Sequence, residues 1–198
     1  LNTIEVLKQY FGYDSFRNGQ ESIINAILEG RDTLAVMPTG AGKSICYQVP
    51  ALMLPGVTLV ISPLISLMQD QVKSLNENGI HAAYINSSLS DSQISRALEA
   101  AAKGTYKIIY VAPERLESSE FIRFASQVQI SMVTVDEAHC ISQWGQDFRP
   151  SYLKIIDFVG SLSKRPILSA FTATATEEVK NDIACILNLR NPHVVVTG

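Results

Sequence analysis

One short segment of the sequence combines the residue types that bind phosphate. It reads Thr39-Gly40-Ala41-Gly42-Lys43-Ser44 and follows an apolar run at 33–37. Small residues at 40–42 let backbone N–H groups approach phosphate oxygens, the Lys43 ammonium can reach the β- and γ-phosphates, and the Ser44 hydroxyl can hold Mg²⁺. Met37 stands where the strict phosphate-loop pattern has its first glycine, so the match is to a shorter form of the loop. A glycine-rich turn that caps a helix is the structural alternative.

A second segment puts two carboxylates directly after an apolar run. It reads Asp136-Glu137-Ala138-His139 and follows residues 132–135. Unpaired charge beside a core is costly, so the placement indicates a function. We expect Asp136 to bind Mg²⁺, usually through water, Glu137 to polarise the attacking water, and His139 to couple the site to neighbouring segments. A helix start, where the helix dipole favours acids, is the alternative, and the phosphate loop upstream favours the catalytic interpretation.

Two further polar motifs follow apolar runs in the same way. Residues 112–116 read Ala-Pro-Glu-Arg-Leu, and residues 172–174 read Thr-Ala-Thr. The carboxyl ends of parallel strands share one edge of a sheet. We therefore expect all four motifs to line one crevice.

The elements that must position these motifs are short β-rich runs that alternate with helical patterns. Strands are expected at 33–37, 57–62, 82–85, 107–111, 132–135, 167–171 and 194–197. Such alternation is typical of βαβ units, which have right-handed crossovers and a parallel sheet covered by helices on both faces. The sequence predicts an α/β three-layer domain with a mostly parallel central sheet.

The first thirty residues differ from the rest because they carry helical spacing and no strand. We expect an N-terminal helical segment at 1–30 and one α/β domain at 31–198. The length of 198 residues, with 46% apolar and 18% charged residues, fits a single compact domain with a full core.

The composition argues against several classes of protein. Sixteen Lys plus Arg against nineteen Asp plus Glu give a net charge of −3, so there is no strongly basic nucleic-acid footprint. Cys46, Cys140 and Cys185 are widely spaced, which argues against a disulfide framework and a zinc site. The same spacing indicates reduced thiols in an intracellular compartment. Apolar runs are too short to span a bilayer, so we expect no membrane partner. Leu1 stands where an initiator Met would, and we expect the chain to be part of a longer protein.

Taken together, the motifs resemble superfamily 2 helicases, and the likeness to the RecQ family of DNA helicases extends over the whole chain. The family's first motif matches Phe16-Arg17-Asn18-Gly19-Gln20, its phosphate loop matches residues 39–44, and its next motif matches residues 62–71 before the acidic motif. The resemblance implies a RecA-like P-loop NTPase lobe. It also implies that Gln20 reads the adenine edge, Tyr13 stacks on the base and Arg17 supports the pocket. A glutamine amide both donates and accepts, which suits adenine.

Residues 140–150 resemble the aromatic-rich loop of that family, which links DNA binding to ATP hydrolysis. Trp144 and Phe148 can stack on unpaired bases without sequence preference, and Arg149 can contact a phosphate. Aromatic residues beside a proline can also simply pack a loop. The resemblance favours the DNA-coupling interpretation.

The resemblance further implies the first of two lobes, with ATP in the cleft between them and an arginine finger on the second. By itself the chain is expected to bind ATP weakly and to unwind negligibly, because a missing finger removes about three to five orders of magnitude from phosphoryl transfer. For the intact protein the resemblance implies Mg-ATP-driven 3′-to-5′ translocation on single-stranded DNA and duplex unwinding in DNA repair or recombination, in the nucleoid or the nucleus. A nucleotide-controlled binding module without turnover and a lobe of an RNA helicase remain alternatives.

Overall fold

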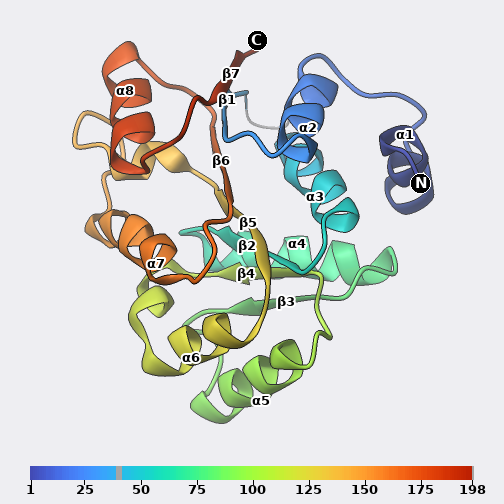
Figure 1. Ribbon diagram of the computed structural model, residues 1–198, viewed down its shortest axis with the longest axis vertical. Coiled ribbons are helices and arrows are strands. Elements are labelled where there is room, and N and C mark those ends of the chain that lie inside the picture. The colour runs from blue at the N-terminus through green and yellow to red at the C-terminus, as the bar shows by residue number, and fades with distance from the viewer. Residues whose placement is uncertain (39–41, 198) are drawn as a thin grey trace.

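The computed structural model describes residues 1–38 and 42–197 and has a seven-stranded sheet at its centre (Figure 1). The strand order is β3-β4-β2-β5-β6-β1-β7, and all neighbouring strands pair in parallel. The strands are β1 (Thr33–Val36), β2 (Val57–Ile61), β3 (Ala82–Ile85), β4 (Ile108–Val111), β5 (Ile130–Val135), β6 (Ile167–Thr172) and β7 (His193–Val196). The prediction of an α/β domain with a parallel sheet is confirmed, and each predicted strand is present with ends that differ by at most two residues.

Continuous apolar runs form the central strands because both faces of the sheet are covered. Every residue of β1 and β2 is buried. At the edge of the sheet, β7 alternates between half-buried and exposed positions, and Val194 and Val196 are exposed. Buried parallel strands read as unbroken apolar runs for this reason.

Helices lie on both faces of the sheet, with α2 and α3 on one side and α7 and α8 on the other (Figure 1). The α-helices are α1 (Thr3–Val6), α2 (Gln20–Leu28), α3 (Lys43–Met53), α4 (Ile65–Glu77), α5 (Asp91–Ala102), α6 (Ser119–Gln127), α7 (Ile155–Ser161) and α8 (Glu177–Ile186). Single turns of other helix types are η1 (Leu7–Phe11), η2 (Pro113–Glu117), η3 (Ala138–Ile141) and η4 (Pro150–Lys154). In the described part of the chain, no helix is long and apolar enough to cross a membrane.

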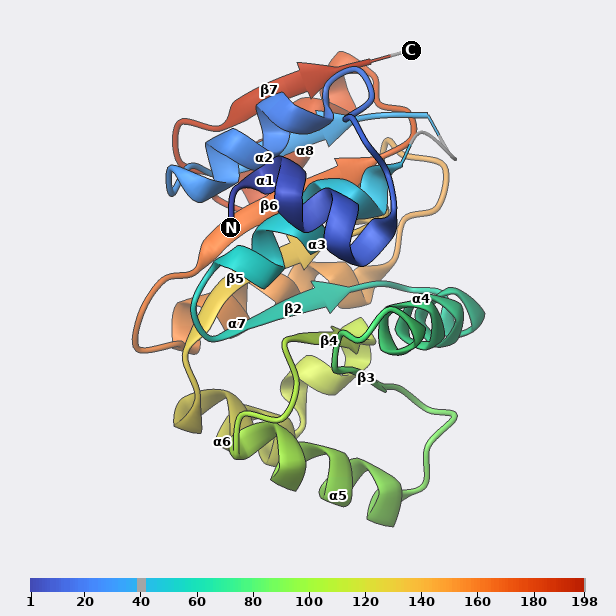
Figure 2. The ribbon, with the colours of Figure 1, turned by 90° about the vertical axis from the view of Figure 1, so that its right-hand side faces the viewer.

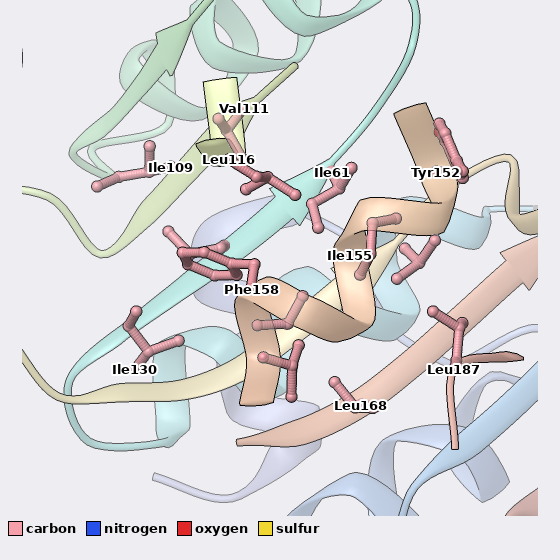
Figure 3. Packing of buried hydrophobic residues seen from close by; sticks show 14 of the residues in the cluster. Ile61, Ile109, Val111, Leu116, Ile130, Tyr152, Ile155, Phe158, Leu168 and Leu187 are labelled. Atoms are coloured by element: carbon pink, nitrogen blue, oxygen red, sulfur yellow. The ribbon is translucent and has the colours of Figure 1, made fainter. Parts of the chain in front are cut away.

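Two apolar clusters fill the space between the sheet and its helices. One joins the sheet to α5, α6, α7 and α8, and Figure 3 shows Ile155 and Phe158 of α7 over the strands that carry Ile61 and Leu168. The other cluster joins the opposite face of the sheet to α2, α3 and α4. The three-layer arrangement is therefore closed on both sides of the sheet.

The N-terminal helices bury their apolar side chains against α3. Val6 and Leu7 share a third cluster with Ile24 of α2 and with Ile45 and Val49 of α3. Figure 2 shows α1 and α2 alongside α3. The N-terminal segment is thus built onto the helix that begins at Lys43, while the division of the chain at residue 30 stays a prediction.

Candidate nucleotide site and aromatic loop

The strand order brings the phosphate loop and the acidic motif together. β6 lies between β5 and β1, so the segments that follow β1 and β5 emerge one strand apart at the same edge of the sheet. A hollow of about 540 Å³ at this edge is lined by Gly42, Lys43 and Ser44 from one segment and by Asp136 and Glu137 from the other. The predicted residues Thr39, Gly40 and Ala41 lie outside the described residues.

Lys43 lies beside both carboxylates of the acidic motif. Its Nζ is 4.0 Å from Asp136 Oδ1 and 3.7 Å from Glu137 Oε1. Asp136 is nearly buried, and burial raises the pKa of its carboxyl from 3.8 to about 6, against the opposing effect of Lys43. The Lys43 ammonium therefore offsets part of the free-energy cost of burying an ionised Asp136 carboxylate.

Glu137 has a backbone conformation that few side-chain-bearing residues adopt. Its φ is 51°, in the left-handed region, and it directly precedes η3. The Glu137 N–H donates to Asp136 Oδ1 over 2.9 Å, and both carboxylates approach the Lys43 ammonium. Sparsely populated backbone conformations of this kind gather at functional sites.

His139 connects the acidic motif to the end of β6. Its Nδ1 is 2.8 Å from Thr172 Oγ1 and 3.5 Å from Glu137 Oε2. The Thr172 hydroxyl has one hydrogen, which it donates to the Thr174 carbonyl over 3.1 Å. The Thr172 side chain thus joins the His139 ring to the backbone at the turn after β6.

Tyr13, Arg17 and Gln20 line the same hollow on the side of the N-terminal helices. Gln20 is buried, its Oε1 accepts from the Arg17 N–H over 2.8 Å, and its Nε2 donates to the Gly42 carbonyl over 3.0 Å. Tyr13 exposes 52% of its surface, so its ring is accessible to a ligand. The amide of Gln20 thus ties the predicted base-binding motif to the predicted phosphate loop.

The segment 140–149, which we call the aromatic loop, lies beside the hollow and does not line it. Trp144 is 76% exposed, whereas Phe148 is half-buried. The Arg149 guanidinium Nε donates to Asp147 Oδ2 over 3.1 Å, and the Arg149 N–H closes the loop by donating to the Cys140 carbonyl over 2.8 Å. Of the three predicted DNA-coupling residues, Trp144 is the most accessible.

The prediction that four motifs line one crevice is wrong for residues 112–116. This segment follows β4, and β2 separates β4 from β5 in the sheet. Pro113 and Leu116 are buried in η2, and Leu116 belongs to the apolar cluster of α5 to α8. The segment 172–174 reaches the site only through the Thr172 contact with His139.

Two residues of the site were missed from the sequence because their partners are far away in the chain. Tyr152, which is fully buried, donates from its hydroxyl to the Asp136 carbonyl over 2.8 Å. Gln48 of α3 donates to Gln71 of α4 over 2.9 Å and so joins the helix of Lys43 to the motif at 62–71. A polar residue within an apolar helical pattern was the available signal for Gln48, and for Tyr152 there was none.

Comparison with known proteins agrees with this geometry. A family model described as DEAD/DEAH box helicase matches residues 17–182. The chain is 53% identical over 194 residues to the ATP-dependent DNA helicase RecQ of Bacillus subtilis, covering 98% of the chain and 33% of that protein. It is 49% identical to the ATP-dependent DNA helicase RecQ of Pasteurella multocida, covering 98% of the chain and 30% of that protein. The chain thus spans about a third of the length of these relatives.

Solved structures share the fold at lower sequence identity. A hypothetical ATP-dependent RNA helicase from Sulfolobus tokodaii matches with a TM-score of 0.77 at 21% identity, covering 98% of this chain and 56% of that one. The yeast DEAD-box splicing factor Prp28 also matches with a TM-score of 0.77 at 21% identity, covering 99% of this chain and 49% of that one. The predicted RecA-like fold and the resemblance to RecQ helicases are confirmed. Since the family model covers most of its length, the chain belongs to the DEAD/DEAH box helicase family.

Proposed function

We propose that this chain is the ATP-binding lobe of an ATP-dependent DNA helicase that couples Mg-ATP hydrolysis to movement along single-stranded DNA and to duplex unwinding. The observation that carries the proposal is the position of Lys43 Nζ, which lies 4.0 Å from Asp136 and 3.7 Å from Glu137 on one hollow. A cation that reaches phosphate, a metal-binding carboxylate and a second carboxylate for water are the parts that nucleotide hydrolysis requires.

The hollow suits a nucleoside triphosphate in volume and in chemistry. Its volume of about 540 Å³ falls within the usual range for small-molecule sites. Tyr13, Arg17 and Gln20 supply an aromatic face, a cation and an amide for the base, while Lys43 supplies charge for the phosphates. With nucleotide bound, the Lys43 ammonium would contact the β- and γ-phosphates.

The oxygen atoms at the phosphate side suit Mg²⁺. Ser44 and Asp136 line the hollow together and offer a hydroxyl and a carboxylate. No group of three or more metal-ligating side chains occurs in residues 1–38 and 42–197. That agrees with Mg²⁺, which takes one or two protein ligands and completes its shell with water and phosphate oxygens. When bound, the ion supplies positive charge against the charge that develops on the phosphates.

The remaining residues handle the water and its proton. Glu137, which has a left-handed backbone and lies beside Lys43, orients the attacking water and polarises it. His139 hydrogen-bonds Thr172 through Nδ1, which holds the ring next to Glu137 and couples the site to the end of β6. Trp144, Phe148 and Arg149 of the aromatic loop contact single-stranded DNA by stacking and by charge.

The other elements of the proposal rest on resemblance. The relatives from Bacillus subtilis and Pasteurella multocida are named as ATP-dependent DNA helicases, which favours DNA over RNA for this chain. We infer a second helicase lobe in the same protein that supplies an arginine finger, a 3′-to-5′ direction, a role in DNA repair or recombination, and an intracellular location.

The test is ATP hydrolysis by the full-length protein with and without single-stranded DNA, for the unchanged protein and for Glu137→Gln. We expect DNA to stimulate turnover, and Glu137→Gln to abolish turnover while nucleotide binding persists, as followed by a fluorescent ATP analogue. Lys43→Ala is the companion variant and should lose nucleotide binding. Absent or DNA-independent turnover in the unchanged protein would instead indicate a nucleotide-controlled binding module, and stimulation by RNA alone would indicate an RNA helicase. The 198-residue chain by itself should bind ATP weakly and unwind negligibly.

A further inference from the structure

One buried serine links the aromatic loop to α8, while backbone bonds from Gly145 to Ser142 and from Arg149 to Cys140 close the loop on itself. Ser142 is fully buried, and its hydroxyl donates to Asp182 Oδ2 of α8 over 2.7 Å. The same oxygen accepts the main-chain N–H of Trp144 over 3.1 Å. A serine hydroxyl has one proton to give and lone pairs to receive, so the chain of donors runs from Trp144 through Ser142 to the Asp182 carboxylate. Each bond in such a chain strengthens the next.

The side chain of Trp144 has little packing of its own to hold it. It is 76% exposed. A hollow of about 340 Å³ separates Trp144 and Gly145 from Thr174–Thr176 and Val179 at the turn from β6 into α8. Because side-chain packing is sparse here, the position of Trp144 depends on the hydrogen bonds of its backbone.

Helix α8 also leads back to the nucleotide site. It follows β6, and Thr172 at the end of β6 contacts His139 Nδ1 over 2.8 Å. One continuous segment, 172–182, thus contacts His139 at one end and Ser142 at the other. A displacement of β6 or α8 would therefore change both the Thr172–His139 contact and the Asp182–Ser142 contact.

We propose that Asp182 is a positioning residue, which through Ser142 fixes the backbone at Trp144 and so presents the indole ring for contact with DNA. The part of this inference that concerns DNA rests on the proposed function. The part that concerns the loop rests on the Trp144–Ser142–Asp182 chain alone. Asp182 contacts neither nucleotide nor DNA in this scheme and acts by holding the loop against α8.

The first test uses the fluorescence of Trp144, which is the only tryptophan in the 198 residues. Time-resolved anisotropy of the chain, without nucleotide or DNA, reports the local motion of the indole ring. Asp182→Ala removes the charge-assisted bond, and we expect the ratio of released to held loop to rise about tenfold, seen as a larger fast component. Asp182→Asn keeps an oxygen that accepts from Ser142 and should fall between Ala and the unchanged chain.

Two further variants separate positioning from general loosening. Glu178→Gln makes the same acid-to-amide change at an exposed site on α8 and should leave the anisotropy decay unchanged. Ser142→Ala should release the loop as Asp182→Ala does, and the double variant should add little to either, since both residues act through one chain. An unchanged Trp144 decay in folded Asp182→Ala, or simple additivity in the double variant, would overturn the inference. If Asp182→Ala does not fold, Asp182→Asn and Ser142→Ala decide it.

The second test is ATP hydrolysis by the full-length protein. We expect Asp182→Ala to lower the ratio of DNA-stimulated to DNA-free turnover about tenfold and Asp182→Asn to restore most of it. If the unchanged protein is not stimulated by DNA, the proposed function fails while the anisotropy result still decides the role of Asp182. If stimulation is present and Asp182→Ala retains it fully, the positioning role is refuted and the proposed function stands.

Discussion

The hydroxyl of Tyr152 donates a hydrogen bond over 2.8 Å to the main-chain carbonyl of Asp136. Tyr152 is fully buried in η4, directly after the aromatic loop, so the bond ties the end of that loop to the strand end that carries both carboxylates. Tyr152→Phe keeps the ring and leaves the carbonyl without this partner. We expect the free energy of unfolding to fall by about 1–2 kcal/mol, measured by urea denaturation.

Tyr84→Phe is the matched control for that variant. Tyr84 is half-buried on β3, at the edge of the sheet farthest from β7 and away from the acidic motif. Removing the Tyr84 hydroxyl should change the free energy of unfolding by less than about 0.5 kcal/mol. Equal effects of the two variants would mean that the Tyr152 bond contributes no more than an ordinary tyrosine hydroxyl.

The burial of Asp136 predicts an unusual dependence of stability on pH. Burial raises the pKa of this carboxyl from 3.8 to about 6, so the folded chain binds a proton more tightly than the unfolded chain does. The contribution of the protonated carboxyl to stability is fully present below pH 3.8 and is lost as the pH rises through about 6. Without Mg²⁺, Asp136→Asn should therefore be more stable than the unchanged chain at neutral pH, by up to roughly 3 kcal/mol.

Urea denaturation of both chains between about pH 3.5 and pH 8 measures this difference. The advantage of Asp136→Asn should vanish at the acidic end, where the carboxyl is protonated in both states. A constant difference across the range would show that the stability change comes from side-chain shape and not from ionisation. Asp157→Asn, at an exposed position in the first turn of α7, is the control for the same acid-to-amide change.

The sequence was sufficient for the strands and for the residues that follow them. Apolar runs such as 57–61 form strands because both sheet faces are covered, and Lys43 and Asp136 meet because each follows a parallel strand. Strand order could not be predicted, since the apolar runs of β2 and β4 look alike. For that reason the segment 112–116 was placed in the crevice although β2 separates it from β5.

Contacts between distant residues were equally inaccessible. The Ser142–Asp182 bond joins residues 40 positions apart, and the Gln20–Gly42 bond joins residues 22 positions apart. Each of these bonds depends on how a loop folds back onto a helix. The spacing of residues along one strand or helix does not predict such a contact.

Asp32 anchors the end of the sheet opposite the nucleotide site. It is buried, and its carboxylate accepts bonds from Arg165, at 3.1 and 2.7 Å, and from the N–H groups of Leu168, at 3.0 Å, and Arg190, at 2.7 Å. Asp32→Ala removes the acceptor of the Leu168 and Arg190 N–H groups and the carboxylate partner of the half-buried Arg165 guanidinium, which keeps its bonds to the Pro166 and Asn188 carbonyls. We expect a loss of about 1–3 kcal/mol in the free energy of unfolding. Nucleotide binding by the folded fraction should persist, because Asp32 precedes β1 and Lys43 follows it. The exposed Glu29→Ala is the control and should be close to neutral.

Gly42 and Gln20 should be energetically coupled. Gly42 has a φ of 78°, and a Cβ built there would lie 2.3 Å from Gln20 Nε2. Gly104 is the control: its φ is 83°, and a Cβ built there meets nothing within 4 Å. Gly104→Ala should therefore cost only the backbone strain, about 1–2 kcal/mol, and Gly42→Ala should destabilise the chain by more. Adding Gln20→Ala should recover part of the loss, as a double-mutant cycle by urea denaturation would measure. Strict additivity would mean that the two residues do not meet.

Trp144 gives the most direct test of how the aromatic loop acts. Its ring is 76% exposed and lies beside the hollow at Thr174–Thr176, so a base can stack on it without displacing the core. Stacking of a base on an aromatic ring contributes about 1–3 kcal/mol, and Trp144→Ala should weaken DNA-stimulated turnover of the full-length protein by roughly ten- to a hundredfold. Trp144→Phe keeps an aromatic face and should retain part of the stimulation. If the role of Trp144 were purely structural, the two variants would differ in melting temperature and not in the DNA concentration that gives half-maximal turnover. Equal stimulation in Trp144→Ala and the unchanged protein would remove the indole ring from the DNA contact and shift that role to Phe148 and Arg149.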